Sequence, residues 1–484
     1  YLANAGESTC SFGDLEDYHF YEGWYQGSFL GYLDLRKTPN QEAAVANEAA
    51  RPVTMSECVG AFTTDKNGFP VRPLQIGAAL CWGGNDYGDS KSAQNYQAFI
   101  MKQAIEQFRR FREYNPRLSG IMPYTVLYAN WNRVRIFSDM KAKIAADQMR
   151  ISFQPVLLSW ENWTPNIYAG TDYKTIVHVI NDSNYGTDLI NAVLNWELAD
   201  NYGNIVERGT IELPAIKYFT SYSMPVGFKV NAKLEPGVYR LSGMIKQSGR
   251  PISVNDIRLF IGNSDFVRKG QSDNSAVRLY DPSGKYRDAF NKLGIKYAEL
   301  ASFAGLREGN LLVLGENIDT EKLAADKATI MEFVNAGGHI LCLAMNDEIM
   351  KTLELDKYMK LVRIDSKNGV FINKARPDDI LFASIPSDSG LAYWNDYNGW
   401  DESKPGYPQV APVAKSFRLN NPNVLTDVAV LANFGRGLAD VALARIYSGN
   451  GSITVSGFDF LPRVGMDPLS DRMLTNLISF ASSK

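Results

Sequence analysis

The spacing of apolar residues changes along this 484-residue chain, and that change most limits its fold. Between residues 151 and 263, apolar and polar residues alternate in short runs separated by turn sequences. Ala192, Leu194 and Trp196 fall on one face of such a run, which is the period of a half-buried antiparallel strand. The predicted strands are 151–160, 173–182, 190–200, 205–213, 221–230, 237–246 and 254–261. This pattern over roughly 110 residues predicts an immunoglobulin-like β-sandwich, which we place at 146–267.

The pattern changes again after the polar stretch 268–275. Short apolar runs with almost no alternation now separate helical segments, which is typical of a parallel sheet covered on both faces. The predicted strands are 276–280, 310–314, 339–343 and 452–455, and the predicted helices are 285–293, 320–336 and 468–481. Residues 268–484 are therefore expected to form a doubly wound α/β domain.

The first part of the chain follows a third pattern. The extended runs 17–21, 54–57 and 119–127 each end in polar residues, and 93–114 has the spacing of an amphipathic helix. Strands that end in polar residues are typical of a (β/α)8 barrel, whose active site lies at the carboxyl ends of its strands. A whole barrel takes about 250 residues. We therefore expect 1–145 to be the C-terminal part of a barrel, with an N-terminal remainder of the same protein supplying its other strands.

Composition excludes several classes of function. Lys and Arg total 50 against 53 Asp and Glu, so the chain has no basic excess for nucleic acid. Its four cysteines and three histidines are scattered, which predicts neither a metal site nor a disulfide framework. No uncharged apolar run is long enough for a membrane span. We expect no cofactor, and we expect carboxylates to carry any chemistry.

Glu57 is the first candidate for that chemistry. It ends a β-branched run, R-P-V-T-M-S-E, that is followed by C-V-G. A carboxylate at the end of a rigid strand can be held as a nucleophile. A salt-bridged or capping glutamate would occupy the same kind of position, so the spacing alone leaves both interpretations open.

Three motifs in order resemble one enzyme family. They are D-Y-H-F-Y-E-G-W-Y at 17–25, R-P-V-T-M-S-E-C-V-G at 51–60 and N-P-R-L-S-G-I-M-P-Y at 115–124. Together they resemble the last third of the catalytic barrel of glycoside hydrolase family 2. This resemblance implies that Glu57 is the catalytic nucleophile and that the hydroxyl of Tyr21, three residues before Trp24, orients it. The substrate-binding residues that we assign beside them are His19, Tyr124, Trp82 and Asp86.

The chain also departs from that family. Tyr124 stands where the family usually has a tryptophan under the sugar. The family's acid/base glutamate lies on an earlier strand than the three motifs, and we assign no residue of this chain to its role. The N-x-K-G segment of β-glucuronidases has no counterpart in 130–141, which disfavours glucuronic acid.

The C-terminal part contains L-L-V-L-G-E-N at 311–317 and F-V-N-A-G-G-H-I-L-C-L-A at 333–344. With these segments it resembles the flavodoxin-like, amidotransferase-like domain that follows the barrel in some β-galactosidases and assembles their subunits. Cys342 lies inside a predicted strand rather than at a nucleophile elbow, and no histidine follows His339. The sequence also lacks a G-x-G-x-x-G motif for a dinucleotide. We therefore expect a non-catalytic domain and a possible homo-oligomer.

Two functions follow from these inferences. The preferred one is a retaining exo-β-glycosidase that removes terminal, β-galactoside-like sugars from oligosaccharides or polysaccharides. The alternative is a non-catalytic carbohydrate-binding or subunit-assembly scaffold with an inert barrel remnant. A periplasmic or secreted location is expected for either.

Overall fold

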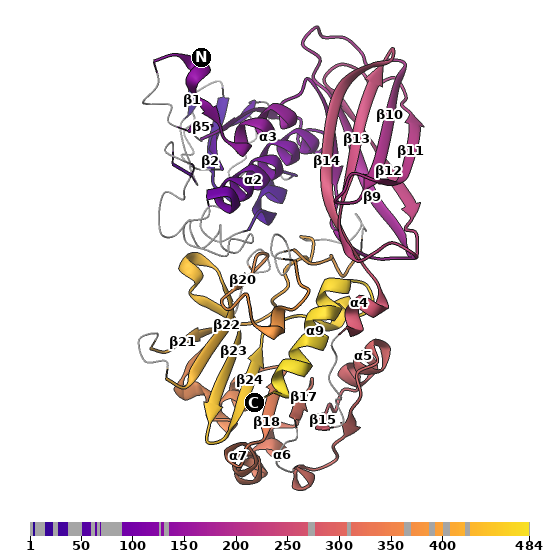
Figure 1. Cartoon of the computed structure of the whole chain (residues 1–484). Coiled ribbons are helices and arrows are strands. Elements are labelled where there is room, and N and C mark those ends of the chain that lie inside the picture. Colours follow the sequence, from indigo (N-terminus) through magenta and orange to yellow (C-terminus); the bar gives the residue numbers. More distant parts are fainter. Residues whose placement is uncertain are drawn as a thin grey trace. The chain divides into compact units, whose positions relative to one another are not determined.

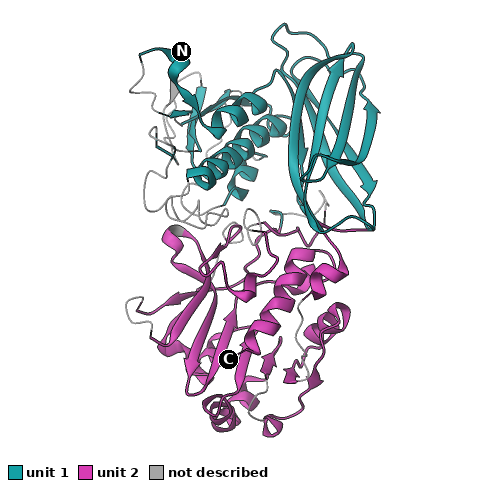
Figure 2. Ribbon diagram, viewed as in Figure 1, with its two compact units in different colours: residues 1–165, 170–261, 400–408 teal, residues 166–169, 262–399, 409–484 magenta. Residues whose placement is uncertain are grey.

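The chain forms two compact units in the computed structural model (Figure 2). The first unit contains residues 1–165, 170–261 and 400–408, and the second contains 166–169, 262–399 and 409–484. The structure describes residues 3–4, 15–22, 28–36, 51–59, 63–64, 68, 90–124, 127–129, 135–269, 276–306, 311–362, 369–386, 393–399, 407–421 and 426–483. Together they form a mixed, sheet-rich, multidomain protein.

The first sheet of unit 1 is parallel and follows the order of the sequence. Its main strands are β2 (Leu15–Phe20), β3 (Val53–Cys58) and β4 (Leu118–Pro123), and the short β1 (Ala3–Asn4) pairs with β2. Each neighbouring pair is parallel, so the carboxyl ends of β2, β3 and β4 meet at one edge. Strands β2 and β3 lie at the predicted runs 17–21 and 54–57, whereas β4 ends at Pro123, before the end of the predicted run 119–127.

Helix α2 (Ser90–Phe111) packs on this sheet (Figure 1). Its apolar residues recur every three or four positions, so that Tyr96, Ile100 and Ala104 are fully buried on one stripe. The helix was predicted over 93–114, but it ends at Phe111, a few residues before Asn115-Pro116, where proline removes a backbone donor and restricts the residue before it.

The second layer of unit 1 consists of antiparallel sheets. One has the order β12-β9-β7, and the other contains the neighbours β11-β10-β13-β14. Alternate side chains of β10 are buried, as the two-residue period predicts. The strands are β7 (Val156–Glu161), β9 (Asp172–Asn181), β10 (Ala192–Ala199), β11 (Ile205–Glu212), β12 (Thr220–Lys229), β13 (Gly237–Gln247) and β14 (Arg250–Gly262).

The sequence prediction for the first of these strands was wrong at its start. Residues 151–160 were expected to be one strand, but Ile151 and Ser152 close helix α3 (Ile144–Ser152). The strand begins only after Pro155. Alanine, glutamine, methionine and arginine precede Ile151, and these good helix formers extend the helix into the apolar run.

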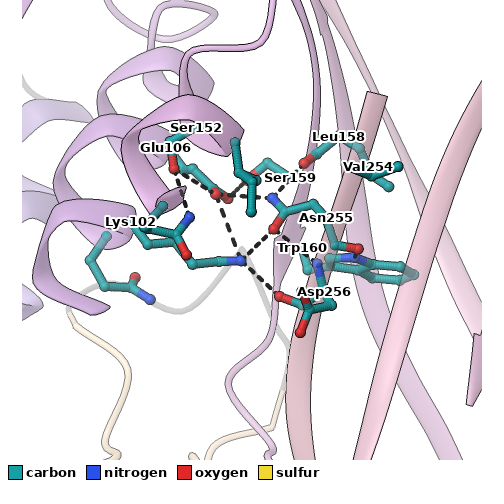
Figure 3. Close-up of polar contacts among 12 residues, drawn as sticks. Lys102, Glu106, Ser152, Leu158, Ser159, Trp160, Val254, Asn255 and Asp256 are labelled. Atoms are coloured by element: carbon teal, nitrogen blue, oxygen red, sulfur yellow. Dashed lines mark hydrogen bonds and ion pairs between the residues drawn. The ribbon is translucent and has the colours of Figure 1, made fainter. Parts of the chain in front are cut away.

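A buried polar network joins α2 and α3 to the antiparallel sheets (Figure 3). The carboxylate of Glu106, 1% exposed, accepts hydrogen bonds from Ser152 at 3.1 Å, Ser159 at 2.7 Å and the Asn255 amide at 2.9 Å. The Lys102 ammonium lies 3.7 Å from Glu106 and donates to the Asn255 side chain at 2.6 Å. Each buried charge therefore has partners, as burial requires.

A second buried carboxylate lies at the end of β7. Glu161 contacts the His178 ring at 2.7 Å, Arg36 at 3.4 Å and Arg110 at 3.9 Å, and it accepts from the Trp163 indole at 3.2 Å. Burial alone would raise the pKa of Glu161, but Arg110, His178 and Arg36 outweigh burial and lower that pKa to about 2. The cluster ties α2 to β7 and β9.

This cluster predicts acid sensitivity of unit 1. Unfolded Glu161 takes up a proton near its ordinary pKa of 4.5, whereas the folded carboxylate stays charged down to about 2. The charged Glu161 thus contributes about 3 kcal/mol to the free energy of unfolding of unit 1. This contribution is complete above pH 4.5 and is lost as the pH falls toward 2. Hydrogen exchange of α2 at pH 6 and pH 3 measures it. Glu161→Gln should be less stable at pH 6 and should lose this part of the pH dependence; an unchanged dependence would contradict the assignment.

Unit 2 is built on one large mixed sheet. Its parallel part has the order β16-β15-β17-β18-β24, and its antiparallel part continues from β24 through β23 to β21 and β19, with β22 beside β23. The strands are β15 (Val277–Tyr280), β16 (Ala298–Glu299), β17 (Leu311–Leu314), β18 (His339–Cys342), β19 (Met359–Val362), β20 (Asn373–Lys374), β21 (Ser416–Leu419), β22 (Val428–Phe434), β23 (Asp440–Ser448) and β24 (Gly451–Ser456).

The helices of unit 2 cover this sheet, and the central strands β17, β18 and β24 are buried throughout. The predicted helix 320–336 is divided at Asp326, since aspartate is a poor interior residue for a helix. The antiparallel strands were not predicted from the sequence. The helices are α4 (Ser264–Arg268), α5 (Lys285–Leu293), α6 (Thr320–Ala325), α7 (Lys327–Asn335), α8 (Asp347–Thr352) and α9 (Pro468–Ala481).

Across the described residues, no helix combines the length and the apolar character that a bilayer crossing requires.

Candidate active site

The carboxyl ends of β2, β3 and β4 bring four of the predicted site residues together. His19 lies directly opposite Glu57 in the ladder between β2 and β3. Tyr21 follows β2, and Tyr124 follows β4. Parallel pairing in sequential order is what places these residues, which are distant in the chain, at one edge.

Tyr21 and Glu57 form the central contact of this cluster. The Tyr21 hydroxyl donates a hydrogen bond to Oε2 of Glu57. Burial, the hydrogen bond to Glu57 and the charge of Glu57 all raise the pKa of Tyr21 well above its ordinary value. The hydroxyl therefore stays protonated near neutral pH and remains a donor to the carboxylate.

His19 approaches the same carboxylate oxygen. Its Nδ1 lies 3.3 Å from Oε2 of Glu57, and the two side chains are 35% and 34% exposed. Within the described part of the chain, Oε1 of Glu57 has no hydrogen-bond partner. One oxygen is thus contacted by Tyr21 and His19, and the other has no partner in the part of the chain that the structure describes.

Tyr124 borders the cluster through a fixed backbone and an exposed ring. Its amide donates to the carbonyl of Cys58 at 2.9 Å, which anchors it beside the end of β3. Its ring meets the Tyr21 ring edge to face, with centroids 6.5 Å apart, and 55% of the residue is exposed. An exposed aromatic face beside a carboxylate suits stacking on a sugar ring.

Some predicted residues cannot be placed in the site, and one residue of the site was missed. Trp82 and Asp86 lie outside the described residues, as does Trp24 of the first motif. Asp17 was not predicted as a site residue, yet its carboxylate holds the strand that bears Glu57. The spacing of the buried residues Val53, Met55 and Cys58 in β3 is irregular, which is the sequence signal for this arrangement.

The corresponding strand ends in unit 2 are organised differently. The Asp281 carboxylate follows β15 and accepts the backbone amides of Tyr286 at 2.8 Å and Arg287 at 3.0 Å at the start of α5. These amides, which would otherwise suit a phosphate, are therefore occupied by a side chain. Cys342 is fully buried within β18, and burial raises the pKa of its thiol.

In the described parts of the chain, no group of three or more His, Cys, Asp or Glu side chains converges. Cys58, next to Glu57, is fully buried, and burial raises the pKa of its thiol.

The sequence matches no known family profile, and none of the curated proteins matches it. Among solved structures, an exo-chitosanase from Amycolatopsis orientalis is similar with 15% identity and a TM-score of 0.30, over 38% of this chain and 21% of that one. A β-D-mannosidase from Dictyoglomus thermophilum is similar with 12% identity and a TM-score of 0.31, over 51% of this chain and 30% of that one. A CARDB domain from Pyrococcus furiosus has 12% identity and a TM-score of 0.18, over 22% of this chain and 96% of that one. The chain therefore spans less than a third of each of the two glycosidases.

Proposed function

We propose that this chain carries the nucleophile half of a retaining exo-β-glycosidase site, with Glu57 as the nucleophile. One observation carries the proposal: a carboxylate at the end of a parallel strand whose Oε2 accepts from the Tyr21 hydroxyl while Oε1 is open among the described residues. The hydrogen bond orients the carboxylate and stabilises its negative charge. A purely structural glutamate gains nothing from an open oxygen.

The proposed reaction proceeds in two displacements. Oε1 of Glu57 attacks the anomeric carbon while a carboxylic acid protonates the departing glycosidic oxygen, so that a glycosyl ester forms and the glycosidic bond breaks. Water then attacks the same carbon, its proton passes to the second carboxylate, and Glu57 leaves as an anion. We place the acid outside the described residues, at the distance of about 5–5.5 Å from Glu57 that retention requires.

The proposed substrate is a terminal β-linked sugar of an oligosaccharide or polysaccharide, with β-galactosides first among the candidates. Tyr124 would lie under the sugar ring, and His19 would contact a hydroxyl group while it faces Oε2. Unit 2 would serve assembly of the protein rather than catalysis.

Covalent trapping tests this function. The complete protein is incubated with 2,4-dinitrophenyl 2-deoxy-2-fluoro β-glycosides of galactose, glucose and mannose, and the peptides are mapped by mass spectrometry. We expect a burst of dinitrophenolate and one adduct, on Glu57. NMR of the first-formed sugar product completes the test, and we expect the anomeric carbon to keep the configuration of the substrate. Sugar binding without a burst, adduct or turnover would favour the non-catalytic scaffold.

Removal of the Tyr21 hydroxyl should slow the enzyme without abolishing it. Tyr21→Phe should lower kcat by about 10²-fold, since one positioned donor to the reacting charge is lost. Tyr18→Phe is the matched control, because the Tyr18 hydroxyl donates to Glu16 at 3.2 Å and alternation places it on the other face of β2. Equal rates for the two variants would show that Tyr21 does not orient the nucleophile.

A further inference from the structure

Strand β3 contains one additional residue immediately before the end that bears Glu57. Asp17 lies opposite Thr54, and His19 lies opposite Glu57. Two steps along β2 therefore match three steps along β3, which is a β-bulge in β3. The ladder between β3 and β4 shifts in the same part of β3. Both neighbours thus locate the bulge independently.

The bulge decides which face of the sheet Glu57 occupies. Val53 and Met55 are buried against the core, and the next buried residue is Cys58. A regular strand would bring Glu57 to the same buried face as Val53 and Met55. Because of the extra residue, Ser56 and Glu57 are both only partly buried, and Glu57 reaches His19 and Tyr21.

Asp17 holds this bulge with both oxygens of its carboxylate. Oδ1 accepts the backbone amide of Ser56 at 3.0 Å and the hydroxyl of Thr54 at 2.9 Å, and Oδ2 accepts a short hydrogen bond from the Ser56 hydroxyl. A bulge leaves a backbone donor outside the regular ladder, and such a donor is costly when unpaired. The Asp17 carboxylate supplies that acceptor.

We propose that Asp17 is a positioning residue that clamps the Ser56 bulge and thereby turns Glu57 onto the site face of the sheet. The role in catalysis rests on the proposed glycosidase function, whereas the clamp itself is a property of the fold. Asp17 acts through β3 and does not touch the substrate. Its substitution should therefore impair only those steps in which Glu57 takes part.

Two substitutions at Asp17 distinguish loss of the hydrogen-bond acceptors from loss of the negative charge alone. In the complete protein, Asp17→Ala should lower kcat for a 2,4-dinitrophenyl β-glycoside by about 10²-fold, since small misplacements of a reacting group cost that much. KM should change little. Asp17→Asn should restore most of the rate, because its amide oxygen still accepts the Ser56 amide. Asp147→Ala, at a residue whose side chain is 70% exposed, is the control with wild-type rates.

Azide rescue tests whether Asp17 acts through Glu57. In Glu57→Ala, azide attacks the anomeric carbon, the bond to the aryl oxygen breaks, and the products are the α-glycosyl azide and dinitrophenolate. Adding Asp17→Ala should change this rescued rate by less than about twofold, because coupled substitutions are non-additive. A further 10²-fold loss would show that Asp17 serves the substrate or the fold instead, and would overturn the proposal.

Hydrogen exchange at Ser56 provides a readout that needs no turnover. The Ser56 amide should be protected in the wild-type protein and in Asp17→Asn, and should exchange at least about tenfold faster in Asp17→Ala, while α2 stays protected. Equal protection of Ser56 in all three would refute the clamp even in an active glycosidase. If the Ser56 amide exchanges faster in Asp17→Ala but the wild-type protein has no glycosidase activity, the role of Asp17 in holding the bulge is supported and only the proposed function is refuted.

Discussion

Replacing Glu57 with glutamine should lower kcat by about 10⁴-fold or more and leave the fold intact. The amide has nearly the same shape as the carboxylate and can still accept the Tyr21 hydroxyl, but it cannot form the glycosyl ester as an anionic nucleophile. The measurement is turnover of dinitrophenyl β-glycosides by the complete protein, with adduct formation by the fluorinated analogue as a second readout.

The matched control for this substitution is Glu113→Gln. Glu113 follows α2 in the same unit, and its carboxylate makes an exposed 3.3 Å contact with Ser221. This variant should keep the wild-type rate. More than a tenth of wild-type activity in Glu57→Gln, on every glycoside that the wild type cleaves, would remove Glu57 from the mechanism.

The largest effect on stability is expected at Glu106. Glu106→Ala should reduce the free energy of unfolding of unit 1 by about 3–5 kcal/mol, because breaking a buried ion pair strands the charge of its partner. Here Lys102, which is 13% exposed, loses its counter-charge, and the amide of Asn255 loses one of its two acceptors. Protection of the α2 amides against hydrogen exchange reports the loss directly, separately from unit 2.

The size of that effect can be checked against two further variants. Glu113→Ala removes an exposed carboxylate near the same helix and should change stability by less than about 0.5 kcal/mol. Lys102→Met combined with Glu106→Leu removes both charges and should recover much of the stability. A Glu106→Ala protein as stable as Glu113→Ala would mean that the network in Figure 3 contributes no net stability.

Much of the secondary structure could be predicted from local sequence. The two-residue period of 192–199 places β10, and the three- and four-residue spacing of 93–111 places most of α2. The failures are also local in origin. Helix α3 extends into an apolar run that resembles a strand, and the antiparallel strands β21, β22 and β23 lack the regular alternation that would have marked them.

The candidate site was only partly accessible to the same reasoning. The motifs place Tyr21 and Glu57 at strand ends, but their hydrogen bond depends on the register between strands 36 residues apart in the chain. The bulge in β3 could have been found from the spacing of Val53, Met55 and Cys58, which is two and then three residues. That interval signals an extra residue in the strand, although it does not name the partner that holds it.

The sequence by itself determined many of the strands and helices, and which polar residues follow β2 and β3, because these depend on side chains a few positions apart. The tertiary structure alone decided that β2 and β3 pair with His19 opposite Glu57. It also decided that the Asp17 carboxylate meets the Ser56 amide and that Glu106 meets Asn255 across α2 and β14. These contacts join residues far apart in the chain, and their geometry is set by packing and register, to which every neighbouring element contributes.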